Sequence, residues 1–147
     1  MTKSIRQSFK TIEMDPNFPL AHNQLGLAYL EKHMHGEAIA ELQKAVQLSG
    51  GSPICMANLA RAYVASGKRS EAIKLLGDLK NRSSPGYPDS EIAVIYASLG
   101  DTDQAMNWLE KAYGKRFNPS VLLRPGFDLL RSDPRFENLV RRIGLPR

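Results

Sequence analysis

The chain has 147 residues, of which 42% are hydrophobic and 24% are charged, a composition typical of a folded globular protein. No apolar run approaches the roughly 18 residues that a membrane-spanning helix needs, and the polar start MTKSIRQSFK does not resemble a secretory leader. The single cysteine, Cys55, excludes an internal disulfide framework. These features favour a cytoplasmic protein.

The net charge of +5 comes entirely from the end of the chain. Residues 1–113 carry 12 basic and 12 acidic residues, whereas residues 114–147 carry 8 basic and 3 acidic residues. Arginines can bind nucleic acid by neutralising phosphates. Here they are interleaved with apolar residues and acids, so the pattern favours a solvated helix face. Nucleic acid is kept only as a minor alternative partner.

The first predicted element is a helix in the stretch SIRQSFKTIEMDPNF. Ile5, Phe9 and Ile12 share one helical face, and the run Asp15, Pro16 and Asn17 predicts a turn. No helix precedes this one to cover its apolar face. We therefore expect either a missing upstream segment or a partner, such as a second copy of the chain, on that face.

Three pairs of helices are predicted next, because two apolar patterns recur at one spacing. The first pattern reads LGLAY, LARAY and IAVIY, and the second reads AIAEL, AIKLL and AMNWL. Both recur after 34 and then 33 residues, starting at Leu25, Leu59 and Ile92 and at Ala38, Ala72 and Ala105. The turn sequences EKHMHGE, ASGKRSE and SLGDTDQ, each with a glycine, separate the two patterns. Each unit is therefore predicted to be an antiparallel helix pair.

Small residues predict close approach of the two helices in each pair. Gly26, Ala60 and Ala93 leave room for Ala38, Ala72 and Ala105. Tyr29, Tyr63 and Tyr96 are predicted to fill the space toward the following pair. One pair cannot bury both of its apolar sides, so the pairs are expected to stack into an all-α superhelix.

The last predicted helix lies in the stretch SDPRFENLVRRIGLP. Asp133 is its expected cap and Pro134 its first residue. One apolar stripe follows, made of Phe136, Leu139, Val140 and Ile143, and Gly144 is expected to end the helix. We expect this C-terminal capping helix to cover the last pair.

The repeated unit resembles the tetratricopeptide repeat, which carries Leu, a small residue, Tyr, Ala, a large apolar residue and Ala in fixed order. The first unit supplies Leu25, Gly26, Tyr29, Ala38, Leu42 and Ala45. The resemblance implies one domain, residues 1–147, divided into a half repeat (1–18), three repeats (19–52, 53–85 and 86–113) and a C-terminal cap (114–147). The segment from MNWLEKAY to GLP also resembles the ends of bacterial multidomain proteins in which such an array follows a kinase or winged-helix regulatory domain.

The resemblance implies a non-catalytic protein-interaction module that holds a peptide segment or helix of a partner in a concave groove lined by the first helices. The candidate partner-binding residues are Asn23, Gln24, Leu27, Ile54, Asn58, Arg61, Tyr87, Glu91 and Val94. Asn58 and Arg61 are expected to fix the register of the peptide. Arg61 and Glu91 have the alternative role of neutralising one another across adjacent helices.

Self-association through the N-terminal helix, giving a homodimer, is the alternative function, and nucleic-acid binding by the basic tail is a minor one. The sequence has no glycine-rich phosphate loop, paired cysteines or nucleophile elbow, so we predict no enzymatic activity and no cofactor. His33 and His35, two residues apart with His22 upstream, are interpreted as turn residues and not as metal ligands.

Overall fold

The computed structural model describes residues 3–82, 87–114 and 122–143. These residues form helices and no strand, which confirms the predicted all-α class. The helices are α1 (Lys3–Met14), α2 (Pro19–Glu31), α3 (His35–Leu48), α4 (Pro53–Ala65), α5 (Arg69–Lys80), α6 (Tyr87–Ser98), α7 (Thr102–Gly114), the 3-10 helix η2 (Pro125–Leu130) and α8 (Pro134–Ile143). Within these ranges, every helix is too short or too polar to cross a bilayer.

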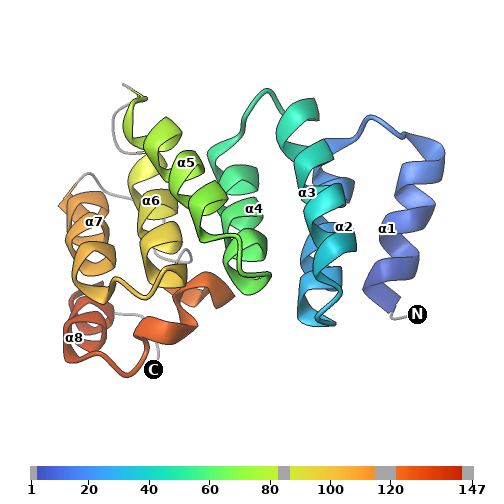
Figure 1. Cartoon of the computed structure of the whole chain (residues 1–147). Helices are drawn as coiled ribbons and strands as arrows, with labels where there is room; N and C mark the ends of the chain where they lie inside the picture. The colour runs from blue at the N-terminus through green and yellow to red at the C-terminus, as the bar shows by residue number, and fades with distance from the viewer. Residues whose placement is uncertain (1–2, 83–86, 115–121, 144–147) are drawn as a thin grey trace. The chain divides into compact units, whose positions relative to one another are not determined.

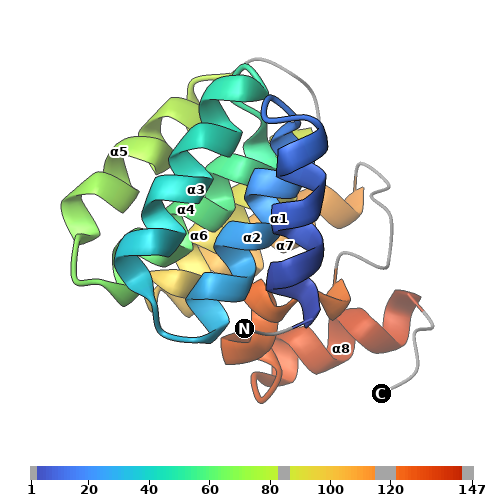
Figure 2. The ribbon, with the colours of Figure 1, turned by 90° about the vertical axis from the view of Figure 1, so that its right-hand side faces the viewer.

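The chain forms two compact units, Met1–Leu75 and Leu76–Arg147, and the boundary between them falls inside α5. In the first unit α1 packs along α2, α2 pairs with α3, and α3 packs against α4 (Figure 1). Viewed from the side of α1, that helix lies directly over α2 (Figure 2). The first unit therefore has the predicted lone helix followed by the pair α2–α3, against which α4 packs.

Close approach between α2 and α3 depends on a glycine. A methyl group on Gly26 would lie 2.5 Å from Cγ of Leu42 and 3.3 Å from the carbonyl oxygen of Ala38. Leu42 and Ala38 are fully buried. The predicted role of Gly26 is thus confirmed, because no larger residue fits between these helices without moving Leu42.

The turn between α2 and α3 has a histidine where the later turns have glycine. His33 has a left-handed backbone with φ 60°, whereas Gly67 and Gly100, at the same place in the later turns, have φ 83° and 84°. Gly36, the glycine of the first turn sequence, lies inside α3 instead. The glycine was predicted to stop the helix, and in the first unit this was wrong, because His33 reverses the chain.

Each tyrosine of the first helices contacts the helix that precedes it, whereas the sequence pattern predicted a position toward the following pair. Tyr29 packs on the cluster that contains Ile5 of α1. The hydroxyl of Tyr63 accepts a hydrogen bond of 2.9 Å from Nε2 of Gln43 in α3, and that of Tyr96 accepts one of 3.0 Å from Nζ of Lys80 in α5. In the first unit α2 packs against α1 and α4 packs against α3. The tyrosines therefore lie on helix faces that contact the preceding helix.

In the second unit α6 pairs with α7, η2 packs on α6, and α8 packs on α7. Phe136 and Leu139 of α8 are buried, and the ring of Phe136 lies 6.3 Å from that of Phe127. Oδ1 of Asp133 accepts a hydrogen bond of 2.9 Å from the backbone N–H of Arg135, as expected of the cap. The predicted capping helix is confirmed, and Gly144 lies outside the described residues.

Candidate functional site

The candidate site in the first unit is the surface where α2 lies against α4, and we call it the α2–α4 face. It contains six of the nine predicted residues: Asn23, Gln24, Leu27, Ile54, Asn58 and Arg61. Ile54, Asn58 and Arg61 share one side of α4 because they are spaced four and three positions apart. On α2, Leu27 lies four positions after Asn23 and three after Gln24, so it is close to both along the helix surface. The structure divides them into two buried amides, Asn23 and Asn58, and four residues that are exposed or partly exposed.

Asn23 and Asn58 form a buried amide link between the two helices. Nδ2 of Asn58 donates a hydrogen bond of 3.1 Å to Oδ1 of Asn23, and the two residues are only 2% and 6% exposed, respectively. Nη1 of Arg61 donates a longer, weaker bond of 3.4 Å to Oδ1 of Asn58. These amides therefore hold α2 and α4 together and orient Arg61, so their polar atoms point into the fold.

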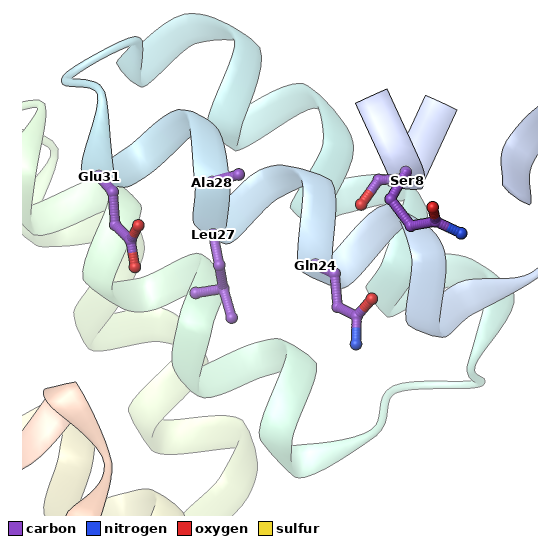
Figure 3. A pocket seen from close by; sticks show the side chains of 6 residues that line it. Ser8, Gln24, Leu27, Ala28 and Glu31 are labelled. Carbon is purple, nitrogen blue, oxygen red and sulfur yellow. The ribbon is translucent and has the colours of Figure 1, made fainter. Parts of the chain in front are cut away.

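The exposed part of the face continues into a cleft between α1 and α2 with a volume of about 450 Å³. Gln24, Leu27 and Glu31 leave the same side of α2, and Ser8 approaches from α1 (Figure 3). Ala28 and half-buried Leu27 give the cleft an apolar floor. The cleft is thus an open, mixed surface on helices that are already packed.

The rim of the cleft is formed by polar side chains. Within the described residues, the side chains of Gln7, Gln24 and Glu31 make no hydrogen bond or ion pair. Glu31 places a negative charge at one end, and the two amides offer both donors and acceptors. The sequence did not identify Gln7 and Ser8. The signal that could have identified them is the three-residue spacing of Ile5 and Ser8 on α1. Both residues are buried, so this face of α1 lies toward α2.

The predicted residues of the third unit lie on α6, and two of them, Glu91 and Val94, are buried. Glu91 and Val94 are 2% and 0% exposed. The guanidinium of Arg124 pairs with Oε1 of Glu91, and η2 packs over the helix. Glu91 therefore has an ion-pair partner that the sequence did not indicate. Tyr87 begins α6, and its side chain lies outside the described residues.

The histidines have structural roles. His22 is 4% exposed, with Nδ1 2.6 Å from Oε2 of Glu41 and Nε2 2.7 Å from the carbonyl oxygen of Pro16. His33 and His35 lie in or next to the turn, with ring centroids 6.2 Å apart. Across the described ranges, no three His, Cys, Asp or Glu side chains gather as a metal site would require.

Four of the five tail arginines in the described residues are paired with carboxylates. Besides Arg124, Arg135 lies 2.9 Å from Asp103, Arg131 lies 2.9 Å from Asp128, and Arg142 pairs with Glu110. Part of the excess positive charge is therefore neutralised on the surface of the second unit.

Three models of the tetratricopeptide repeat match the chain, at residues 10–40, 29–84 and 91–114. The chain belongs to the tetratricopeptide repeat family. Repeats of this family are generally protein-interaction modules, whose stacked helices present extended binding surfaces. The matched residues include both helices of the α2–α4 face. A search of the curated proteins found no match to the chain.

Proposed function

We propose that this tetratricopeptide repeat protein is a non-catalytic module that binds an extended segment of a protein partner on the α2–α4 face and in the adjoining cleft. The observation that carries the proposal is the cleft itself. An apolar floor of Leu27 and Ala28 lies beside Gln7, Gln24 and Glu31, whose side chains are unpaired within the described residues. Apolar area next to free polar groups is what an extended peptide needs, since its side chains and its backbone must both be satisfied.

The predicted residues have two different roles in this proposal. Gln24, Leu27 and Ile54 are at least partly exposed and contact the partner, with Ile54 38% exposed. Asn23 and Asn58 are buried and keep the two helices in register, while Arg61 is positioned by Asn58. Because the contact residues stand on packed helices, binding requires little reorganisation of the protein.

Tyr87, Glu91 and Val94 belonged to the predicted groove. The proposal assigns partner contact to the first unit alone, because Glu91 and Val94 are buried in the second unit beneath residues of the same chain.

Site-specific photo-crosslinking in the native cell tests the proposed surface. A photoreactive amino acid at Leu27 is compared with one at Gln47, an exposed residue of α3. We expect discrete crosslinked proteins from position 27 that are absent from position 47. The same proteins captured at both positions, or none at position 27, would contradict the assignment.

Leu27→Asp then measures the contribution of the apolar floor. Placing a charge where an apolar partner group is buried costs at least the lost burial, roughly 1.5 kcal/mol or more, which corresponds to about a tenfold weaker affinity. Titration calorimetry with the partner identified by crosslinking measures the change, and Gln47→Asp is the matched control. Equal affinity for the Leu27→Asp variant and the control would rule out this surface.

Self-association is a second candidate, favoured by the exposed apolar residues of α1. Phe9 and Met14 are 37% and 83% exposed. If α1 packs against a second copy, sedimentation velocity should show a concentration-dependent dimer, and Phe9→Glu with Met14→Glu should return it to monomer. A monomer at all concentrations removes this candidate and leaves the first untouched.

A further inference from the structure

In the second unit, residues 122–130 lie on α6, over the two predicted binding residues Glu91 and Val94. We call residues 122–130 the resident segment. By the repeat spacing of 34 and 33, Glu91 corresponds to Asn58 and Gln24, and Val94 to Leu27. The resident segment therefore occupies, on α6, the helix positions that face the cleft on α2.

The first contact of the resident segment is a charge pair. The guanidinium of Arg124 binds Oε1 of Glu91, whose side chain is 3% exposed. The other oxygen, Oε2, is buried and has no hydrogen-bond partner within the described residues. A buried carboxylate needs a cationic partner, because leaving it alone costs several kcal/mol or so in a low-dielectric site. Glu91 thus favours a cationic side chain, here Arg124, in whatever covers it.

The second contact is a close fit. A methyl group on Gly126 would lie 2.9 Å from Cγ1 and 3.4 Å from Cγ2 of Val94. Val94 is fully buried, and its branched side chain has little freedom to turn away. Glycine is therefore the residue that fits two positions after the arginine.

The third feature is that Arg131, the residue after the segment, holds the shape of the segment. Nη1 and Nη2 of Arg131 donate hydrogen bonds of 3.2 and 3.1 Å to the carbonyl oxygens of Leu122 and Arg124. Phe127 is fully buried, whereas Leu123 and Leu129 are 60% and 66% exposed. The segment thus presents one side to the fold and the other to solvent, as a bound peptide does.

We propose that the α6 surface formed by Glu91 and Val94 is a peptide-binding site that the chain fills with its own resident segment, and that the same segment supplied in trans can replace it. The ligand class is a peptide with arginine, then glycine two residues later, then an aromatic residue, as in LLRPGFDLLR at residues 122–131. This proposal goes beyond the partner surface of the first unit and does not depend on it.

Hydrogen exchange on the unmodified full chain gives the first test. A resident ligand detaches by local opening, so amides of residues 122–130 should exchange several-fold faster than those of α6 and α7. If the amides of residues 122–130 exchange as slowly as the slowest amides of α6 and α7, the segment is an integral part of the fold and the proposal is overturned.

The second test replaces the segment. Gly126→Ala weakens the resident segment but leaves Glu91 and Val94 intact, so a labelled LLRPGFDLLR peptide should bind this variant and bind the unmodified chain at least tenfold more weakly. The peptide with its own glycine changed to alanine, and the peptide with its arginine changed to alanine, should both fail. If the double variant Gly126→Ala, Glu91→Gln binds the peptide as tightly as Gly126→Ala alone, the proposed site is wrong.

A second host guards against misfolding of the first. Arg124→Ala removes only the charge contact, and Arg124 is 24% exposed. If either host keeps its helical circular dichroism, yet the peptide does not bind it, the proposal fails. It also fails if exchange of residues 122–130 is unchanged in both hosts. Neither test uses a partner protein, so its outcome is distinct from that of the proposed function.

Discussion

His33 takes a backbone conformation that its side chain disfavours. Its φ of 60° lies in the left-handed region, where the two equivalent turns have Gly67 and Gly100. For residues with a Cβ this region costs roughly 1 kcal/mol or more, and glycine avoids that cost.

We therefore expect His33→Gly to stabilise the protein by about 0.5–1 kcal/mol, the strain relieved less the added freedom of glycine in the unfolded chain. Urea denaturation followed by circular dichroism measures the change. Gly67→His is the reciprocal control, and it should destabilise, since a Cβ there has no neighbour within 4 Å and only backbone strain is introduced. Loss of stability in His33→Gly would show that the histidine side chain makes a stabilising contact.

Two glycines separate packing from backbone effects. Gly26→Ala places a methyl 2.5 Å from Cγ of Leu42, so we expect destabilisation of about 1–3 kcal/mol. Gly36→Ala, in α3 with nothing within 4 Å of its Cβ, should instead stabilise by about 0.5–1 kcal/mol. Urea midpoints of the two variants are compared. Equal shifts in the same direction would contradict the assigned packing role of Gly26.

At the scale of single helices, sequence periodicity predicted the elements well because the signals are local. The apolar repeats at Leu25 and Ala38 and the cap at Asp133 each lie within the helix that they define. The burial of Glu91 and Val94 could not be predicted in this way. It depends on Arg124 and Gly126, more than 30 residues later, and no periodic pattern links those positions to α6.

The start of α8 adds a pH-dependent contribution. Hydrogen bonds from Arg135 lower the pKa of Asp133 below the ordinary value of 3.8. The bond from the side chain of Arg135 has the larger effect, and the bond from its backbone N–H has the smaller one. Because the folded pKa is below the unfolded one, this stabilisation is fully present above the unfolded value and is lost as the pH falls through the lower folded value. The Asp133–Arg135 pair is partly exposed, so its contribution to stability should weaken with added salt.

Asp133→Ser isolates this charge, because serine keeps a cap oxygen and does not titrate. We expect the variant to melt below the unmodified protein by a constant interval from pH 7 to pH 5, and the interval to close below pH 3.8. Thermal unfolding monitored by circular dichroism measures both. An interval that widens on acidification would have the wrong sign for a lowered pKa.

At the scale of the whole molecule, the sequence predicted one array of stacked pairs, and the structure divides into two compact units. Equal repeats give no sign of a boundary, because Leu76 holds the same place in its unit as Leu42 and Leu109 do. The boundary instead reflects which residues pack together around each core. The cleft between α1 and α2 was not predicted either, because one of its two walls is α1, which lies outside the repeated helix pairs.

Two cores imply that damage to one should be felt mainly within its own unit, because stability in repeat proteins is a sum of local and neighbouring terms. Leu109→Ala removes a fully buried side chain of α7 and should cost about 2–5 kcal/mol. Gly26→Ala acts in the first unit. Hydrogen exchange should therefore rise in α6, α7 and α8 for the first variant and in α1, α2 and α3 for the second. If both variants speed exchange equally along the described chain, the two units unfold as one cooperative body. The division at Leu75 would then describe geometry without an energetic boundary.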